Sequence, residues 1–303
     1  MAARGRLAEA RAARGLSSEL GGILLALLAM CCFGSMDGIS KFLVGHYPPA
    51  LVLWLRHVVA VPLVLLVLWS RGLIVLARSA RPWLQLARTT LLVIEMGIVL
   101  LAFRSLPLAD VHAVLAVTPL MVTALAVPVL GERVGWRRWL AVAAGFAGVL
   151  LIIRPGFGTL SPMLLLVLLC SVMYAVYNIM TRLVAKDDPA ETSWLWQSIG
   201  GAILLTFVGP FFWVPLVPAH IPLLLVLAGL GAIGHYCLIR ALATVPAVVV
   251  QPFTYTLLVW ATVIGYVVFG DLPDGYTIVG AVIVAAAGMY AAWREHVRKS
   301  LQQ

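Results

Sequence analysis

The sequence predicts an all-α integral membrane protein, in which ten transmembrane helices form two inverted five-helix repeats around a central cavity. Three observations predict this fold: an apolar composition, a series of helix-length apolar segments, and a similarity between the two halves of the chain. Of 303 residues, 63% are hydrophobic and 11% are charged, whereas soluble domains carry about 25% charged residues. The chain therefore has too few charged side chains to cover a surface in water.

The formal net charge of +9 raises nucleic acid as an alternative partner, because basic proteins often bind acidic polymers. Here the basic residues are confined to short connections between apolar segments, so anionic membrane lipid is the expected counterion. We expect no nucleic-acid partner, and a monomer in the bilayer. Four cysteines lie within apolar segments without the spacing of zinc ligands, so we expect no metal, cofactor or disulfide: Cys31, Cys32, Cys170 and Cys237.

Apolar segments of about 20 residues, the length that crosses a bilayer, are separated by Pro, Gly and charged residues. They are continuously apolar rather than alternating, which favours helices over a β-barrel. The fifth segment is the shortest. The predicted spans are residues 21–44, 49–70, 83–103, 109–130, 138–153, 160–184, 191–214, 221–243, 247–269 and 276–293.

An Ala- and Arg-rich tail, residues 1–20, precedes the first span, and we expect it to lie on the membrane surface. Residues 21–44 are too long for the apolar region of a signal peptide and contain Asp37 and Lys41, so they predict a retained span. The predicted organisation is a cytoplasmic N-terminal tail (1–20), a first repeat (21–153), a second repeat (160–293) and a cytoplasmic C-terminal tail (294–303).

The distribution of Lys and Arg predicts the orientation. One side of the predicted membrane carries 17 of the 21, in the tails, alternate connections and adjoining span ends, and the other side carries Arg104 and Arg154; Lys41 and Arg56 lie within spans. Cytoplasmic loops carry the excess of basic residues in membrane proteins. We therefore expect a multi-pass protein of the inner (plasma) membrane with both termini in the cytoplasm.

The two halves of the chain are similar in sequence. Residues 33–41 align with residues 174–182, which places Asp37 opposite Asn178 and Lys41 opposite Arg182. Because each half has five spans, an odd number, the second half crosses the membrane in the opposite sense, as in many carriers that work by alternating access. Further aligned pairs are Arg56 with Gln197, Arg104 with Arg240, and Gly131-Glu132 with Gly270-Asp271.

Each half also carries short motifs, which lie at residues 102–110, 118–120 and 130–133 in the first half, and at residues 251–255 and 269–274 with Gly280 and Gly288 in the second. Together they resemble the drug/metabolite transporter superfamily, specifically its EamA-type ten-helix members. Two positions depart from the family pattern: Asp271 stands where Glu is usual, and Leu140 where Gly is usual. The resemblance implies a cavity between the halves and a small-molecule substrate.

The function that the resemblance implies is secondary transport of small metabolites. We expect an exporter of aromatic or neutral amino acids with broad specificity. The alternative is an importer of another metabolite, such as S-adenosylmethionine or riboflavin. An integral membrane enzyme is a further alternative, although the connections contain no HExxH motif, no nucleophile–base set and no Gly-rich phosphate loop. We therefore expect no enzymatic activity.

Charged side chains at membrane depth are the first candidates for the substrate site, because burying them in a bilayer is costly. Asp37 and Lys41 lie one helical turn apart, so they either pair with each other or bind the two charges of a zwitterion. Glu95 lies near the middle of the third span, and either carries a coupling proton or makes a structural hydrogen bond. Asp37 and Glu95 are the two acids that fall well inside predicted spans.

Aromatic and polar residues in the sixth, eighth and ninth spans complete the candidate site. Such a mixed lining suits an amphipathic solute, although a packed helix interface has the same pattern. We expect Arg56 and His57 to lie near the outer interface, and His112 in the core. Pro119 and Pro252 predict kinks in the fourth and ninth spans. The remaining candidates are Tyr174, Tyr177, Asn178, His235, Tyr236, Gln251, Tyr255 and Trp260.

Overall fold

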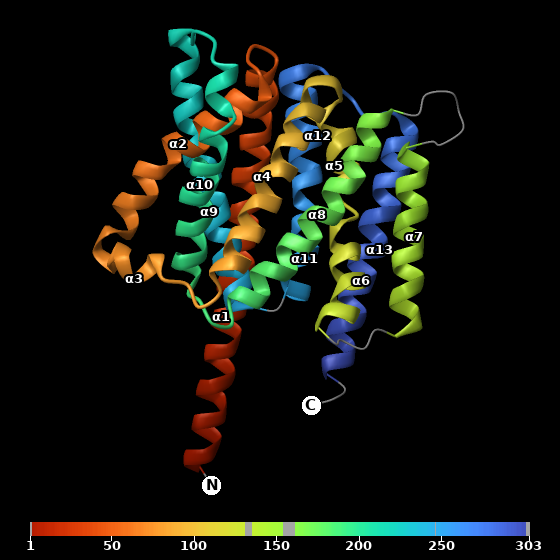
Figure 1. Cartoon of the computed structure of the whole chain (residues 1–303). Helices are drawn as coiled ribbons and strands as arrows, with labels where there is room; N and C mark the ends of the chain where they lie inside the picture. Colours follow the sequence, from red (N-terminus) through yellow and green to blue (C-terminus); the bar gives the residue numbers. More distant parts are fainter. Residues whose placement is uncertain (1, 131–134, 154–160, 246, 301–303) are drawn as a thin grey trace.

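The computed structural model describes residues 2–130, 135–153, 161–245 and 247–300. Within these residues the chain is helical and contains no strand, as predicted (Figure 1). The longer helices are α1 (Ala2–Val44), α2 (Pro49–Leu68), α4 (Pro82–Ser105), α7 (Trp136–Ile153), α8 (Pro162–Val184), α9 (Ala190–Thr206), α10 (Ile221–Thr244) and α13 (Gly275–Ser300). The shorter ones are α3 (Leu73–Ala77), α5 (Leu108–Leu115), α6 (Thr118–Leu130), α11 (Ala247–Thr254) and α12 (Thr256–Phe269), with 3-10 turns at Trp69–Arg71, Gly209–Phe212 and Pro218–His220.

Seven helical segments are long and apolar enough to cross a membrane: Leu20–Val44, Pro49–Arg71, Pro82–Ser105, Leu108–Leu125, Pro162–Val184, Pro218–Thr244 and Pro252–Phe269. They coincide with seven of the ten predicted spans. The predicted fifth and tenth spans are shorter apolar helices, Trp139–Ile153 and Gly275–Ala291. The predicted seventh span corresponds to α9, whose 17 residues end at Thr206 rather than at residue 214. The chain is thus a multi-pass membrane protein.

The N-terminal tail differs from the expectation. Residues 2–20 do not turn onto a surface but continue α1 as one helix that protrudes beyond the bundle (Figure 1). This segment is rich in Ala, Leu, Glu and Arg, which favour helix, and contains no proline to end it. The start of α1 and the end of α13 lie at the same end of the bundle (Figure 1).

Two predicted spans are broken close to their prolines. The fourth span divides into α5 and α6 at residues 116–117, immediately before Thr118 and Pro119. The ninth divides into α11 and α12 at Tyr255, three residues after Pro252. Proline lacks an N–H group and its ring collides with the preceding turn, so the break before Pro119 follows from the sequence. The break at Tyr255 lies on the other side of its proline, since Pro252 is inside α11.

Helix packing pairs elements of the two halves in a regular way. Helix α1 packs along α10, α11 and α12, and α8 packs correspondingly along α4, α5 and α6. Helix α2 packs on α9, and α7 on α13. If α1 corresponds to α8, α4 to α10 and α5–α6 to α11–α12, each contact in the first set has a counterpart in the second. In Figure 1, α5 lies above α6 whereas α12 lies above α11, so the two broken helices run in opposite directions.

The contact between α7 and α13 is close enough to require glycine. A Cβ atom at Gly148 would lie 2.9 Å from the carbonyl oxygen of Gly280, and a Cβ atom at Gly280 would lie 2.7 Å from the carbonyl oxygen of Gly148. Small residues let transmembrane helices approach backbone to backbone. Gly148 and Gly280, the second of which belongs to the motifs of the second half, therefore let α7 and α13 pack closely.

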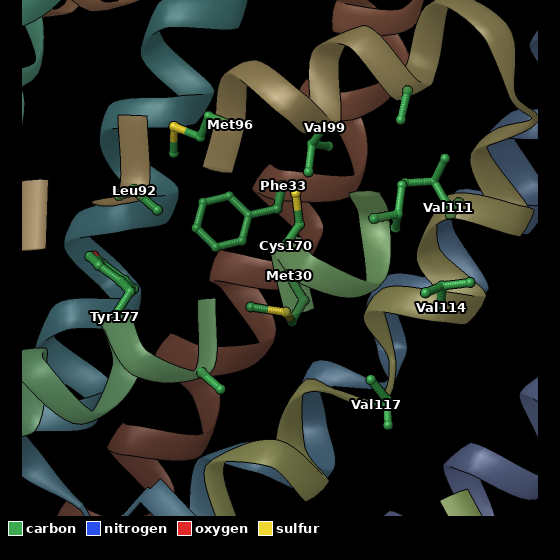
Figure 2. Close-up of a cluster of buried hydrophobic side chains, with 14 of the residues drawn as sticks. Met30, Phe33, Leu92, Met96, Val99, Val111, Val114, Val117, Cys170 and Tyr177 are labelled. Atoms are coloured by element: carbon green, nitrogen blue, oxygen red, sulfur yellow. The ribbon is translucent and has the colours of Figure 1, made fainter. Parts of the chain in front are cut away.

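The centre of the bundle is an apolar core in which α1, α4, α5 and α8 meet (Figure 2). Met30 and Phe33 of α1 face Leu92 and Met96 of α4 there, while Cys170 comes from α8. Many large apolar side chains lie on the outside instead, such as Leu66, Ile74, Val75, Trp83 and Phe211. Contiguous apolar surface of this kind is unusual for a soluble protein, and lipid is its expected surrounding.

Candidate functional site

A cavity of about 130 Å³ lies between the halves, beside the central core. Both broken helices contribute to it, together with α1, α2, α4, α8 and α10. Its apolar wall includes Met30, Phe33, Met36 and Met96. Its polar lining consists of Asp37, Arg56, Glu95, His112, Thr118, Tyr174, Asn178, His235, Thr254 and Tyr255.

The cavity brings together six of the residues singled out from the sequence: Asp37, Glu95, Tyr174, Asn178, His235 and Tyr255. Four others lie elsewhere: Lys41, Tyr177, Tyr236 and Trp260. The side chain of Gln251 is outside the described residues. Arg56 and His112 line the cavity although we expected an interfacial and a core position for them.

Asp37 does not pair with Lys41 on its own helix. Its Oδ2 lies instead 3.2 Å from Nε2 of His112, across the space between α1 and α5. The approach is close but misaligned, because Nε2 of His112 has no hydrogen-bond partner. The two side chains are therefore close but not hydrogen-bonded, and both remain able to bind a ligand.

Arg56 is buried, and sulfur atoms are its hydrogen-bond acceptors. Its Nη1 lies 3.4 Å from Sδ of Met36 and its Nη2 lies 2.7 Å from Sδ of Met96. The side chain lies against Gly231 of the facing helix, where a Cβ atom would lie 3.6 Å from Cδ of Arg56, an ordinary packing distance. The position of Arg56 two turns after the start of α2 suggested an interface; its alignment with the polar Gln197 was the signal that could have placed it deeper.

Glu95 reaches the cavity from the middle of α4. Its backbone carbonyl accepts a contact from Sγ of Cys170 at 3.7 Å. Within the described part of the chain its carboxylate has neither a hydrogen bond nor an ion pair. The predicted structural hydrogen bond is therefore not formed, and the carboxylate faces a cavity that also contains a cation.

Ring contacts and backbone bonds position the remaining polar groups. Nδ2 of Asn178 donates to the carbonyl oxygen of Tyr174 at 2.8 Å, and Nδ1 of His235 lies 2.8 Å from the carbonyl oxygen of Gly231. The rings of Phe33 and His235 meet edge to face with centroids 4.8 Å apart. Both bonds are to the helix's own backbone, so the free edges of Asn178 and His235 remain for other partners.

Unpaired polar atoms gather at the two breaks. Among the described residues, the buried atoms without a hydrogen-bond partner include Nε2 of His112, Oγ1 of Thr118 and Oη of Tyr255. Thr118 begins α6 and Tyr255 separates α11 from α12. Most buried polar atoms in proteins are hydrogen-bonded. A polar ligand or water at the breaks would satisfy His112 and Thr118; the hydroxyl of Tyr255 is directed at Gly288 on α13.

Lys41 lies in the last turn of α1, at the end of the bundle away from the two termini (Figure 1). Its Nζ lies 2.9 Å from Oδ2 of Asp271 and donates to the carbonyl oxygen of Leu106, also at 2.9 Å. The ammonium group also lies 5.2 Å from the centre of the Phe269 ring. Lys41 thus ties α1 to the α4–α5 connection and to the residues after α12. We call these contacts of Lys41 with Asp271 and Leu106 the latch.

Tyr177 belongs to a buried network around Arg88 rather than to the cavity. The guanidinium group of Arg88 donates to Oη of Tyr177, Oγ1 of Thr181, Oε1 of Gln197, Oε1 of Gln85 and the carbonyl oxygen of Ser193. These bonds join α4, α8 and α9 at 2.7–3.4 Å. Gln85 extends the network to Asp188, with Nε2 donating to Oδ2 at 3.0 Å.

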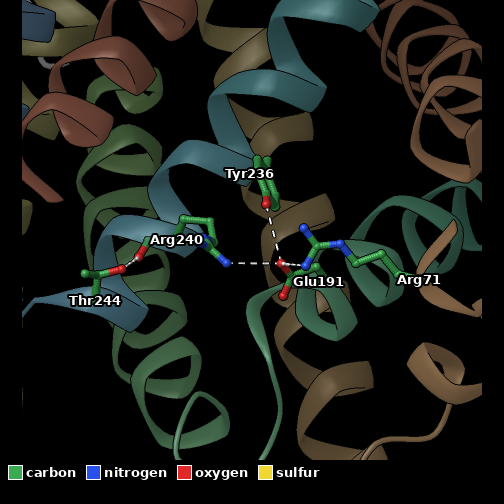
Figure 3. A network of polar contacts seen from close by, with 5 residues as sticks. All are labelled: Arg71, Glu191, Tyr236, Arg240 and Thr244. Carbon is green, nitrogen blue, oxygen red and sulfur yellow. Dashed lines mark hydrogen bonds and ion pairs between the residues drawn. The ribbon is translucent and has the colours of Figure 1, made fainter. Parts of the chain in front are cut away.

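Tyr236 lies in a second polar cluster at the end of the bundle near the termini (Figure 3). Oε1 of Glu191 accepts from Arg71 at 3.2 Å, from Arg240 at 3.1 Å and from Oη of Tyr236 at 3.5 Å. Arg240 therefore pairs with a carboxylate of α9. Trp260 is also outside the cavity and is 37% exposed. It packs against Gly34, where an added Cβ atom would lie 2.5 Å from Cβ of Trp260.

The described residues contain no group of three or more His, Cys, Asp or Glu side chains arranged to hold a metal ion. The four cysteines are free thiols. What the cavity can do chemically is to bind a small solute, since it combines one cation, two carboxylates, aromatic rings and unpaired polar atoms inside an apolar bundle.

Three relatives are similar over most of the chain. An S-adenosylmethionine uptake transporter of Rickettsia prowazekii is 25% identical, over 92% of this chain and 95% of the relative. A riboflavin transporter of Rhizobium johnstonii is 27% identical over 92% and 93%. The pseudopaline exporter CntI of Pseudomonas aeruginosa is 25% identical over 88% and 94%. These relatives are transporters of small molecules rather than enzymes.

One solved structure, described as "Crystal structure of protein", has the same fold, with a TM-score of 0.66, 20% sequence identity, and coverage of 92% of this chain and 98% of that chain. The EamA-like transporter family matches the chain twice, over residues 20–154 and residues 161–291. The two matches together take in almost all the described helices and the whole lining of the cavity. The chain therefore belongs to the EamA-like transporter family.

Proposed function

We propose that the chain is a secondary transporter that takes up a small organic metabolite by alternating access through the central cavity. Ten spans, arranged as two inverted five-helix repeats with both termini in the cytoplasm, make the scaffold. The cavity between the two broken helices is the observation that carries the proposal, since discontinuous helices form the substrate sites of many inverted-repeat carriers.

Two features support the inverted repeat. The contacts of α1 with α10, α11 and α12 are matched by those of α8 with α4, α5 and α6. The broken helices run in opposite directions (Figure 1). The latch supports alternating access, because it closes the end of the bundle away from the termini with a few polar contacts that a second state can give up.

We propose uptake of a metabolite in place of the export of aromatic or neutral amino acids that the sequence suggested. None of the three relatives named above is an amino-acid exporter. The Rickettsia protein is an uptake transporter, whereas the Pseudomonas protein is an exporter, so direction is the part of the proposal that most needs measurement.

Counterflow into proteoliposomes tests the proposal directly. The purified protein is reconstituted with a high internal concentration of one solute and a trace of the same labelled solute outside, for S-adenosylmethionine, riboflavin, phenylalanine and lysine in turn. We expect transient accumulation of at least one, and none in protein-free vesicles. Accumulation of phenylalanine alone would restore the amino-acid reading, and accumulation of none would contradict the transport proposal for these solute classes.

Reporter fusions test the arrangement of spans. Fusions after Arg137 and Lys186 should report the cytoplasm, and fusions after Gly156 and Ala219 the periplasm. A reproducible inversion at any of them would show that a span has been miscounted, most critically around α7 and α9, which fall short of the usual span length.

A further inference from the structure

The cavity contains a cation without an oxygen partner. A guanidinium group has five N–H donors, and the thioether sulfur of methionine is a weak acceptor. Arg56 is 4% exposed, and its bonds go to the sulfurs of Met36 and Met96. A buried charge is costly unless it is paired and hydrogen-bonded. The bonding capacity of Arg56 is therefore largely unused in this structure.

Two carboxylates line the same cavity, yet neither pairs with Arg56. No ion pair within 4.0 Å joins them to the guanidinium group in the part of the chain that the structure describes. Asp37 lies beside His112, and Glu95 has no partner of its own among the described residues. Opposite charges thus face one small space without neutralising each other by contact.

We propose that Arg56 binds the carboxylate of the transported solute while Glu95 and Asp37 bind its positively charged groups, so that the substrate carries an α-amino carboxylate group. The inference rests on the proposed transport function and names its substrate class. Arginine suits this role because its planar fork binds both oxygens of a carboxylate at once. The ammonium group next to that carboxylate then meets the acidic wall.

The charge count favours a particular kind of amino acid. With histidines neutral and both Asp37 and Glu95 ionised, one guanidinium and two carboxylates leave the cavity with an excess of one negative charge. A solute with one carboxylate and two positive groups, an ammonium and a second cation, balances it. The rings of Phe33 and Tyr174 also line the cavity and can hold that second cation through their faces. A neutral ring system such as a flavin has neither a carboxylate for Arg56 nor a positive group for Asp37 and Glu95.

The volume is consistent with recognition of a head group. Sites for whole drug-sized ligands measure about 300–1,000 Å³, whereas this cavity measures about 130 Å³. The space accommodates an α-amino carboxylate group, and a larger remainder requires the cavity to widen, as an alternating-access transporter does between its states.

Ligand pairs that differ only in the carboxylate test this assignment. The probes are S-adenosylmethionine with its decarboxylated form, lysine with cadaverine, and methionine with 3-(methylthio)propylamine. Affinity for the purified full chain is measured from ligand-induced thermal stabilisation. We expect at least one carboxylate form to bind tenfold or more tightly than its partner, which is about 1.4 kcal/mol.

Variants then test whether Arg56 is the residue that distinguishes the carboxylate form from its partner. In Arg56→Gln we expect the ratio of the two affinities to fall to about twofold or less, and in Arg56→Lys we expect part of the ratio to be retained. Arg240→Gln is the matched control, because Arg240 is also a helical arginine but lies in the Glu191 cluster outside the cavity. Its ratio should equal that of the parent.

The outcomes separate this inference from the transport proposal. If no carboxylate form binds more tightly than its partner in the parent, or if Arg56→Gln keeps the full ratio, Arg56 is not the carboxylate site, while counterflow by the parent would still stand. If the ratio is present but no solute shows counterflow, the transport proposal fails and the binding assignment remains. Should Arg56→Gln not fold, the parent's ratios and the Arg56→Lys variant decide.

Discussion

Arg56 and Arg88 are both buried arginines of the membrane region, and they have opposite surroundings. Arg88 is bound by five oxygen atoms from α4, α8 and α9, whereas Arg56 contacts two sulfur atoms beside an open space. A guanidinium group most of whose donors are met by the protein can hold helices together, as in Arg88, where Nε is the atom left without a partner among the described residues. One whose donors are left over can hold a ligand. The difference teaches that the partners of a buried charge, rather than its burial, indicate its role.

The largest effect on stability should come from replacing Arg88. Arg88→Met would remove the donor to Oε1 of Gln85, Oη of Tyr177 and Oε1 of Gln197, of which the last two keep their bond to each other; a buried acceptor left without a donor costs about 1–3 kcal/mol. We expect a strongly lowered unfolding temperature in detergent and a reduced yield of folded protein. Arg88→Lys, which keeps the charge, should be less affected. A variant as stable as the parent would show that the network is not structural.

Arg56→Met should separate function from stability. Sulfur acceptors contribute little and Met is similar in length, so we expect the unfolding temperature to stay near that of the parent. Counterflow of the transported solute should fall tenfold or more, since hydrogen bonds to charged groups contribute about 1.5–3 kcal/mol. Unfolding temperature and counterflow are measured on one preparation. Loss of stability equal to that of Arg88→Met would remove the contrast between the two arginines.

Glu95→Gln tests energy coupling at the same cavity. Glutamine keeps the shape and hydrogen bonding of Glu95 but cannot bind and release a proton. We expect accumulation driven by a pH gradient to be abolished, while exchange at saturating substrate continues. Asp37→Asn is the comparison, because Asp37 already has the ring of His112 beside it. Gradient-driven accumulation that survives in Glu95→Gln would favour facilitated diffusion.

The sequence was most informative where structure depends on neighbouring residues. Apolar segments gave the helices and Pro119 gave the break between α5 and α6. The alignment of residues 33–41 with residues 174–182 sets α1 against α8, and each of these helices packs on the corresponding helices of the other half. Length was the weak point at α9, which ends at Thr206 rather than at residue 214.

Side-chain partners could not be found in this way. Spacing along one helix suggested that Asp37 pairs with Lys41, but Lys41 binds Asp271, 230 residues away, and Asp37 faces His112. Helix spacing identifies only neighbours on one helix, whereas these pairs depend on how helices pack. Arg56 was missed for the same reason, since one of its two sulfur contacts, Met96, is on another helix far away in the sequence. Glu95 has no charged neighbour in the sequence and lines the cavity, and its role there stays a prediction.

The smallest effect should come from the latch, which is partly exposed and therefore screened. The side chain of Asp271 is 33% exposed, and exposed ion pairs contribute about 0.2–1 kcal/mol. Lys41→Gln should therefore shift the balance between states by about fivefold or less toward opening at the end away from the termini. The measurement is the labelling rate of Asn178→Cys by a membrane-impermeant thiol reagent added from that side, with the four native cysteines replaced by serine. Asp271→Asn should act in the same direction, and the double variant should add little to either single one, because both changes remove one contact. Additive effects, or slower labelling, would mean that Lys41 and Asp271 act separately and that this end is closed by apolar packing instead.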